Sequence, residues 1–234
     1  MVVADLPGDA LAQATALVGE AGSEVLGIGC DVRRASDVEA LAAAAVDRFG
    51  TVDLVCLNAG VFHPSTPMWE IDADVWDRVI DTNLWGVVHG VRSFVPILVA
   101  KGSGHVVVTG SISGLVRTAF AGAYAASKHA VVGLSESLQA ELAERAPGVK
   151  VTVVCPAMVR TALTEFVLGP LPAPGEPDPA AAPHILDPDV LAAEVLTGVE
   201  ADELYVVPSP GSAARIETRL HDIISAIGRR AADA

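Results

Sequence analysis

Tyr124 and Lys128 are the residues whose types and spacing best suit proton transfer. They stand four positions apart in a segment with helical periodicity, so both side chains would project from one face, about one turn apart. Tyrosine is a poor base at its ordinary pKa of about 10, and a neighbouring ammonium that favours the phenolate lowers that pKa. The pair could therefore act as a proton-transfer unit, although a surface helix could also bring a phenol and an amine together by chance.

Three further polar residues stand at positions that call for a reason. Ser111 comes directly after a predicted strand at 104–109, and Asn58 follows a predicted strand at 53–57 in the same way. Both would lie at the carboxyl end of a sheet. Asn83 lies inside an otherwise apolar helix pattern, where its amide competes for backbone groups and is mildly unfavourable.

The elements that must position these residues alternate along the chain. Short β-branched runs are separated by longer stretches with helical periodicity, which is the pattern of a parallel sheet with crossover helices. Runs such as 106–108 are apolar on both faces, and Ser36 with Glu39 predicts a capped helix at 37–48. The expected strands are 1–5, 24–30, 53–57, 104–109, 149–155 and 203–207, and the expected helices are 9–20, 37–48, 74–101, 123–145, 188–199 and 212–228. The sequence predicts a single α/β domain over 1–234, with a doubly wound, Rossmann-like, mostly parallel sheet and helices on both faces.

Composition excludes several classes of protein. The 234 residues carry 15 basic and 29 acidic side chains, a net charge of −14, which argues against a nucleic-acid partner because a negative surface repels phosphate. Apolar runs such as 97–100 are far shorter than the roughly 18 residues of a membrane helix, so no membrane association is expected. Cys30, Cys56 and Cys155 have no CxxC spacing and are typical of buried thiols in a cytoplasmic protein. The six histidines show no ligand spacing, so no metal site is expected.

Taken together, the motifs resemble the short-chain dehydrogenase/reductase family, from residue 1 to about residue 210. Any one motif could arise by chance, but their order and spacing together identify the sequence as a member. The matching pieces are Asp5 at the end of an early strand, Asp31-Val32, Asn58-Ala59-Gly60, Asn83, Ser111, Tyr124-Ala-Ala-Ser127-Lys128, and Pro156-Ala157-Met158-Val159-Arg160-Thr161.

The resemblance implies an oxidoreductase that transfers a hydride between a nicotinamide cofactor and a secondary alcohol or carbonyl. Tyr124 would be the general acid or base, and Lys128 would lower the tyrosine pKa and bind the nicotinamide ribose. Ser111 would donate to the substrate oxygen, and Asn83 would hold a water that links Lys128 to solvent.

The resemblance also implies a set of cofactor contacts. Asp31 would reach the adenine, the run 58–60 would line the adenosine side, and Val159 with Thr161 would face the nicotinamide amide. Pro156 is followed by alanine where the family usually has glycine. The full implied set is Asp5, Asp31, Val32, Asn58, Ala59, Gly60, Tyr124, Lys128, Pro156, Val159 and Thr161.

Asp5 bears on the choice of cofactor. A carboxylate at this strand end accepts hydrogen bonds from ribose hydroxyls and repels a 2′-phosphate, so NAD is favoured over NADP. The alternative is a solvated turn acid ahead of Pro7-Gly8.

The position of Asp5 raises a second expectation. In the family an acidic residue follows a glycine-rich turn by about 20 residues, yet here it is residue 5. Gly27-Ile28-Gly29 lies within a predicted strand and opens no helix, so it is not that turn. We therefore expect a domain truncated at its N-terminus, without the first strand, the glycine-rich turn and the first helix.

That first strand would lie mid-sheet, so its loss would leave a gap, a direct pairing of 1–5 with 53–57, or a rearranged sheet. A start codon assigned too far downstream, a fragment and a natural loss of cofactor binding would each explain it. If the chain is complete, activity should be low or nil, and the alternative function is a non-catalytic, oligomer-forming relative.

Two expectations concern the surroundings of the site. Seven prolines within 169–188 indicate a flap, about 157–188, over the cleft, and Leu163, Phe166, Val167 and Leu168 would form an apolar lid or else pack in the core. The helices at 74–101 and 123–145 are expected to form a homodimer or homotetramer. The sequence does not name the substrate.

Overall fold

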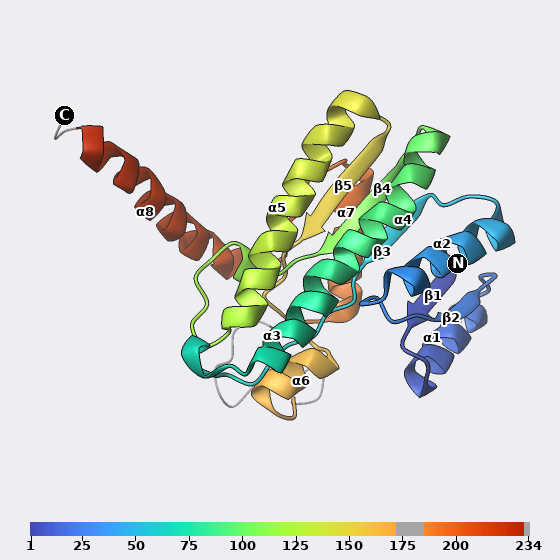
Figure 1. Ribbon diagram of the computed structural model, residues 1–234, viewed down its shortest axis with the longest axis horizontal. Helices are drawn as coiled ribbons and strands as arrows, with labels where there is room; N and C mark the ends of the chain where they lie inside the picture. The colour runs from blue at the N-terminus through green and yellow to red at the C-terminus, as the bar shows by residue number, and fades with distance from the viewer. Residues whose placement is uncertain (172–184, 232–234) are drawn as a thin grey trace.

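Parallel strands flanked by helices make up the computed structural model of the protein, which describes residues 1–171 and 185–231 (Figure 1). The strands are Val2–Asp5 (β1), Leu26–Gly29 (β2), Leu54–Leu57 (β3), Gly104–Thr109 (β4), Val149–Val154 (β5), Met158–Val159 (β6), Ile185–Leu186 (β7) and Tyr205–Val206 (β8). The α-helices are Asp9–Glu20 (α1), Ala35–Phe49 (α2), Ala73–Ile80 (α3), Gly86–Lys101 (α4), Gly122–Arg145 (α5), Ala162–Leu168 (α6), Pro188–Glu200 (α7) and Ala213–Ala231 (α8). Short 3₁₀ turns occur at Met68–Glu70 (η1), Ile112–Gly114 (η3) and Pro210–Ser212 (η4), and a π turn (η2) spans Asp81–Trp85.

The strands form separate hydrogen-bonded sheets. A four-stranded sheet has the order β3-β4-β5-β8, β1 pairs with β2, and β6 pairs with β7; every pairing is parallel. The predicted doubly wound class is confirmed. Of the three sheet arrangements considered above, the structure has the gap: within residues 1–171 and 185–231, no strand joins the β1–β2 pair to β3.

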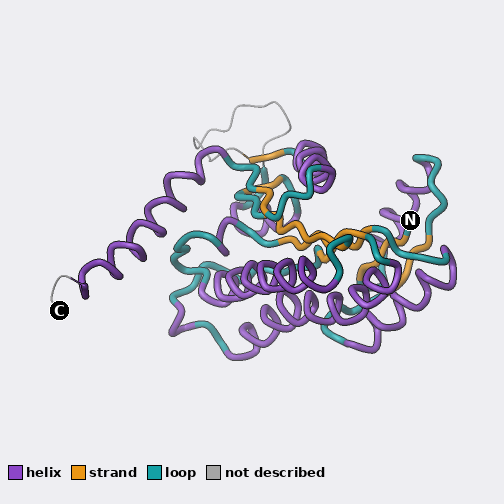
Figure 2. Tube along the Cα trace, turned by 90° about the horizontal axis from the view of Figure 1, so that it is seen from above, coloured by secondary structure: helices purple, strands orange, loops and turns teal. Residues whose placement is uncertain are grey.

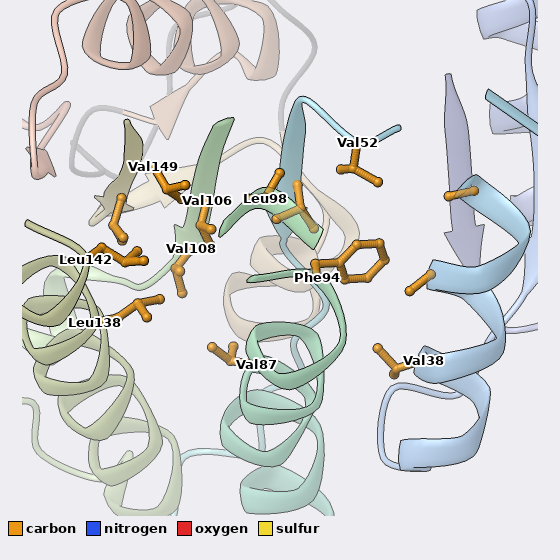
Figure 3. Close-up of a cluster of buried hydrophobic side chains, with 14 of the residues drawn as sticks. Val38, Val52, Val87, Phe94, Leu98, Val106, Val108, Leu138, Leu142 and Val149 are labelled. Atoms are coloured by element: carbon orange, nitrogen blue, oxygen red, sulfur yellow. The ribbon is translucent and has the colours of Figure 1, made fainter. Parts of the chain in front are cut away.

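Helices cover both faces of the four-stranded sheet, as its two-sided apolar strands predict (Figure 2). Alternate residues of β4 point to opposite faces. Val106 and Val108 belong to the large core cluster with α4 and α5, whereas Val107 packs with apolar residues of α7. The core beneath α4 extends across to α2: Figure 3 shows Phe94 of α4 reaching toward α2, from which Val38 points inward. Side-chain packing therefore links the β1–β2 side of the molecule to the four-stranded sheet.

Two helices differ from expectation in detail. α2 begins at Ala35 with Arg34 at its N-cap, so the predicted capping by Ser36 is wrong. Asp37 stabilises this end of the helix instead. Its carboxylate lies in the first turn, where a negative charge interacts favourably with the helix dipole, and it accepts a hydrogen bond from the Asp31 amide. The predicted helix at 74–101 is present, but the π turn η2 separates α3 from α4. By length and composition this stretch would qualify as a membrane span, yet α4 packs on β3 and β4 as a core helix does.

Candidate active site

The carboxyl ends of β3, β4 and β5 bring the predicted polar residues together. Thr109, the last residue of β4, donates its hydroxyl to Asn58 Oδ1 at 2.8 Å, which ties the end of β4 to that of β3. The Lys128 ammonium on α5 donates to the Thr109 carbonyl oxygen at 2.7 Å. The Ile112 amide donates to the Pro156 carbonyl oxygen at 2.9 Å and holds the Ser111 turn beside the end of β5. One edge of the sheet thus positions four of the predicted segments.

Tyr124 and Ser111 face each other in a buried setting. Both side chains are almost fully buried, and the Ser111 hydroxyl lies close enough to the phenol to affect its pKa. Burial raises the pKa of Tyr124 because it disfavours the phenolate, and the nearby Ser111 hydroxyl, which favours the phenolate, only partly offsets this. The pKa of Tyr124 is therefore raised and not lowered as the Tyr–Lys spacing predicted. The Lys128 Nζ atom lies 5.7 Å from the centroid of the Tyr124 ring.

Lys128 carries a charge that the fold has removed from water. Its side chain is buried, and desolvation lowers its pKa to about 8, while nearby Cys155 acts in the opposite direction. Among the described residues it makes one hydrogen bond, to the Thr109 carbonyl, although an ammonium has three donors. A Cβ atom added to Gly60 would lie 3.6 Å from Nζ. The ammonium therefore has donors left for a ligand at a place where glycine keeps the backbone close.

The hydrogen bonds of the Asn83 side chain account for an asparagine inside an apolar helix pattern. Its side-chain amide is fully buried: Oδ1 accepts from the Val61 amide at 2.7 Å, and Nδ2 donates to the Val61 carbonyl at 2.9 Å and to Ser127 Oγ at 3.1 Å. Asn83 lies in the π turn η2, and such turns often occur at functional sites. The residue joins the loop after β3 to α5, next to Lys128.

Phe62 and His63 belong to the site although their types gave no sign of it. The Phe62 ring centroid lies 4.5 Å from that of Tyr124, and the His63 ring stacks on Phe62 at 5.4 Å. His63 is buried, donates from Nδ1 to the Pro64 carbonyl at 2.8 Å, and has an unpaired Nε2, the one such buried side-chain atom in the described part of the chain. Their position just after Asn58-Ala59-Gly60 was the only signal available in the sequence.

Three of the predicted cofactor residues, Asp5, Asp31 and Val32, lie at the ends of β1 and β2, whereas the run 58–60 follows β3 of the four-stranded sheet. Asp5 ends β1, is exposed, and accepts from the Leu6 amide at 2.6 Å. Asp31 pairs with Arg33 at 2.6 Å, and this partner lowers the pKa of the Asp31 carboxyl. Val32 lies close to Gly86 at the start of α4, where a Cβ would come within 2.9 Å of it. These residues therefore do not belong to the Tyr124 cluster itself.

The remaining predicted segments are partly described. Val159 is in β6, and Thr161 caps α6, which carries the four residues of the expected lid, all of them exposed. The lid stays a prediction. The expected flap includes residues 172–184, which lie outside the described residues. Gly27 and Gly29 lie in β2 and pack against Thr15 and Pro7, which agrees with rejecting them as a cofactor turn.

The family model for short chain dehydrogenases matches residues 1–168 of this sequence. The chain belongs to this family. It is 34% identical over 225 residues to the 1-deoxy-11-beta-hydroxypentalenate dehydrogenase of Streptomyces exfoliatus, covering 95% of this chain and 78% of that protein. It is 35% identical over 161 residues to 3beta-hydroxysteroid dehydrogenase 2 of Eggerthella lenta, covering 68% of this chain and 61% of that one.

A solved structure agrees over the whole fold. The short chain dehydrogenase/reductase from Burkholderia phymatum in complex with NAD has a TM-score of 0.85 and 34% identity, covering 95% of this chain and 84% of that one. The protein is thus an oxidoreductase that transfers a hydride between a nicotinamide cofactor and an alcohol or carbonyl substrate. These comparisons do not support the expectation of a truncated N-terminus, and nothing in them favours a non-catalytic relative.

The contact between η3 and α5 gives a first prediction. A Cβ atom at Gly114 would lie 2.5 Å from the Lys128 carbonyl oxygen, a backbone atom that cannot turn aside. Gly114→Ala should therefore push the Ser111 turn away from Tyr124 and Lys128, lowering kcat at least about tenfold and the free energy of unfolding by about 1–3 kcal/mol. Steady-state kinetics and urea unfolding measure both.

Gly133→Ala is the matched control. Gly133 lies on α5, five residues after Lys128, and a Cβ atom added there would meet nothing within 4 Å. It should keep full activity and stabilise the protein by up to about 1 kcal/mol. Equal effects of the two substitutions would contradict the close-packing argument.

Buried Lys128 makes a second prediction, on stability against pH. Its pKa falls from 10.5 to about 8 on folding, so between these values the unfolded chain binds more protons and stability rises with pH. The neutral variant Lys128→Met lacks this contribution, worth about 3 kcal/mol over the whole window. Its free energy of unfolding relative to the wild type should therefore be most favourable at pH 7 and decline toward pH 10.5. Urea titrations of both proteins across that range test this, and a difference independent of pH would show that the ammonium is hydrated.

Proposed function

We propose that Tyr124, Lys128, Ser111 and Asn83 form the catalytic set for oxidation of a secondary alcohol or reduction of the matching carbonyl. The observation that carries this is the buried cluster at the ends of β4 and β5, in which Ser111 lies beside Tyr124 and the Lys128 ammonium makes a single hydrogen bond to the described residues. A phenol, a hydroxyl and an ammonium out of reach of bulk water form the kind of preorganised setting in which charge stabilisation is strong.

The roles follow from what each group can donate or accept. In the oxidative direction, the Tyr124 oxygen takes the proton of the substrate hydroxyl; in the reductive direction it returns that proton to the carbonyl oxygen. Ser111 donates to the same substrate oxygen and so orients it toward Tyr124. The nicotinamide, when bound, accepts or supplies the hydride. The Lys128 ammonium binds the ribose hydroxyls with its spare donors and stabilises the phenolate by its charge.

Asn83 acts in this proposal by position. Its amide bonds fix the Val61 backbone, and Oδ1 lies 3.5 Å from where a Cβ of Gly60 would be, close to the same point as Lys128 Nζ. A water held between this oxygen and Lys128 would pass protons to solvent.

NAD is proposed as the preferred cofactor because of Asp5. Its exposed carboxylate at the end of β1 can accept from the two ribose hydroxyls and would repel a 2′-phosphate. Asp31 and Val32 follow β2 and would contact the adenine, whereas Asn58, Ala59 and Gly60 follow β3 and would line the adenosine side. The nicotinamide end would rest on Pro156, Val159 and Thr161.

The substrate proposed is a secondary alcohol on an apolar carbon skeleton. Phe62 lies against Tyr124, and Phe120, four residues before Tyr124, is exposed, so the surroundings of Tyr124 offer apolar contacts. Two relatives carry names that denote a hydroxysteroid and a hydroxypentalenate as substrates, which agrees with such a skeleton. We further propose that residues 1–234 act as one domain, in the cytoplasm, as a homodimer or homotetramer through α4 and α5, without a metal ion, nucleic acid or membrane as partner.

The first test removes the proposed acid. Tyr124→Phe should lower kcat on a panel of cyclic secondary alcohols and ketones by about 10²–10⁴-fold, because the proton transfer is lost while the ring remains. NADH binding, followed by its fluorescence, should change little.

Tyr205→Phe is the matched control, since the sequence has only two tyrosines and Tyr205, in β8, bonds to Glu136 of α5, eight residues after Lys128. It should keep its activity. Turnover retained by Tyr124→Phe would refute the assignment.

The second test concerns the cofactor. The wild type should bind NADH more tightly than NADPH. Asp5→Ser should lower the ratio of the NADPH to the NADH dissociation constant by about tenfold or more, because a neutral hydroxyl does not repel the 2′-phosphate as the carboxylate does. Asp9→Ser, at the first turn of α1, removes the same charge four residues away and serves as the control. Tighter binding of NADPH by the wild type would overturn the proposal.

A further inference from the structure

The C-terminal helix α8 leaves an aliphatic face uncovered. In both Figure 1 and Figure 2 the helix extends away from the rest of the molecule toward the C-terminus. Ile224 and Ile227 are 66% and 70% exposed, and Leu220 and Ile223 are nearly half exposed. Four large aliphatic side chains in water on one helix are unfavourable unless another surface covers them.

These residues form a single stripe on the helix. At 100° per residue, Ile216, Leu220, Ile223, Ile224 and Ile227 fall within about a third of the circumference. Asp222 lies on the opposite side and pairs with Arg117 of the loop between Ser111 and Tyr124. The helix is therefore tied to its own chain by its polar side, and the aliphatic stripe (these five residues) points away from that contact.

A complementary apolar surface lies beside the active site. Trp69 is 83% exposed, and Met68 and Phe120 are each more than half exposed. They are neighbours: the Thr66 amide donates to the Phe120 carbonyl at 3.1 Å, and Met68 packs against Gly122, two residues before Tyr124. Phe120 has a φ of 59°, a strained value for a bulky residue, which holds its ring at the surface. We call Met68, Trp69 and Phe120 the aromatic rim.

We propose that the aliphatic stripe of α8 packs on the aromatic rim of a second copy of this chain, and that the second copy does the same in return. Each copy would then supply part of the wall at the other's substrate entrance. A mutual exchange of this kind closes on itself with two-fold symmetry and buries both uncovered surfaces in both copies.

Charge also favours a second copy as the partner. α8 carries four arginines and two carboxylates, whereas the chain as a whole has a net charge of −14. A basic helix is therefore attracted to the acidic body of another copy, which steers the approach before the apolar surfaces meet.

The first experiment measures mass in solution by light scattering and sedimentation at 1–50 μM, as an order-of-magnitude range that brackets a micromolar dissociation constant. Ile224→Asp with Ile227→Asp should weaken this association at least about 100-fold and lower the mass of the assembly, because two charges would be buried against the rim. Trp69→Asp should do the same from the other side. Thr218→Asp with Ser225→Asp places the same two charges on the polar side of α8 and should leave the mass unchanged; circular dichroism confirms that all variants are folded.

The second experiment locates the contact. A benzophenone side chain at position 224 should cross-link between two chains, into the peptide that contains Met68 and Trp69, as peptide mass spectrometry would show. A monomeric wild type, an unchanged mass in the stripe variant, or cross-links confined to one chain or to another surface would overturn the proposal. Flotation of the wild type with vesicles of phosphatidylglycerol, lost in the stripe variant, would overturn it in favour of a membrane surface.

Discussion

The buried amide of Asn83 is the interaction on which the geometry of the site depends. One side chain satisfies both backbone groups of Val61 and also reaches Ser127 on α5. It thereby fixes three segments that are far apart in the sequence: the loop after β3, the π turn between α3 and α4, and the helix that carries Tyr124 and Lys128. A buried amide with all its partners is stabilising, whereas any one missing partner would leave a costly unpaired group. The arrangement is therefore close to all-or-none.

The electrostatics of the site follow from that rigid frame. Burial raises the pKa of Tyr124 and lowers that of Lys128 to about 8, so both groups are held nearer to neutrality than in water. The fold bears the cost of desolvating the ammonium in advance, and among the described residues only the Thr109 carbonyl accepts a hydrogen bond from it. A ligand that brings hydroxyl oxygens to the remaining donors recovers part of that cost. The same burial that opposes charge on these groups thus favours binding of a polar ligand.

Much of this could be read from the sequence, for reasons that differ by element. The strands β4 and β5 and the helices α1 and α5 were predicted within about a residue, because β-branched runs and helical periodicity are strong local signals. Asn58 and Ser111 were expected to lie together because each follows a strand, and their grouping with Tyr124 and Lys128 followed from the family resemblance. The start of α2 was predicted at residue 37 but lies at Ala35. Ser36 does not cap the helix, and the Asp37 carboxylate instead accepts a hydrogen bond from the Asp31 amide. The π turn, the Phe62–Tyr124 contact and the raised pKa of Tyr124 arise from tertiary packing, which no local pattern encodes.

The division between the β1–β2 pair and the four-stranded sheet has a mechanical meaning. Parallel strands are locked in register by directional hydrogen bonds, but the two described units are joined mainly by apolar side chains of α2 and α4, whose contacts are non-directional, and by one hydrogen bond between the His89 ring of α4 and the Val32 carbonyl. The seam between them can therefore shear by small amounts without breaking a ladder. Asp5 lies in the β1–β2 unit and Lys128 lies beside the four-stranded sheet, so a dinucleotide that contacted both residues would link the two units. A bound dinucleotide would therefore stabilise the protein at the boundary that no strand pairing crosses in the described residues.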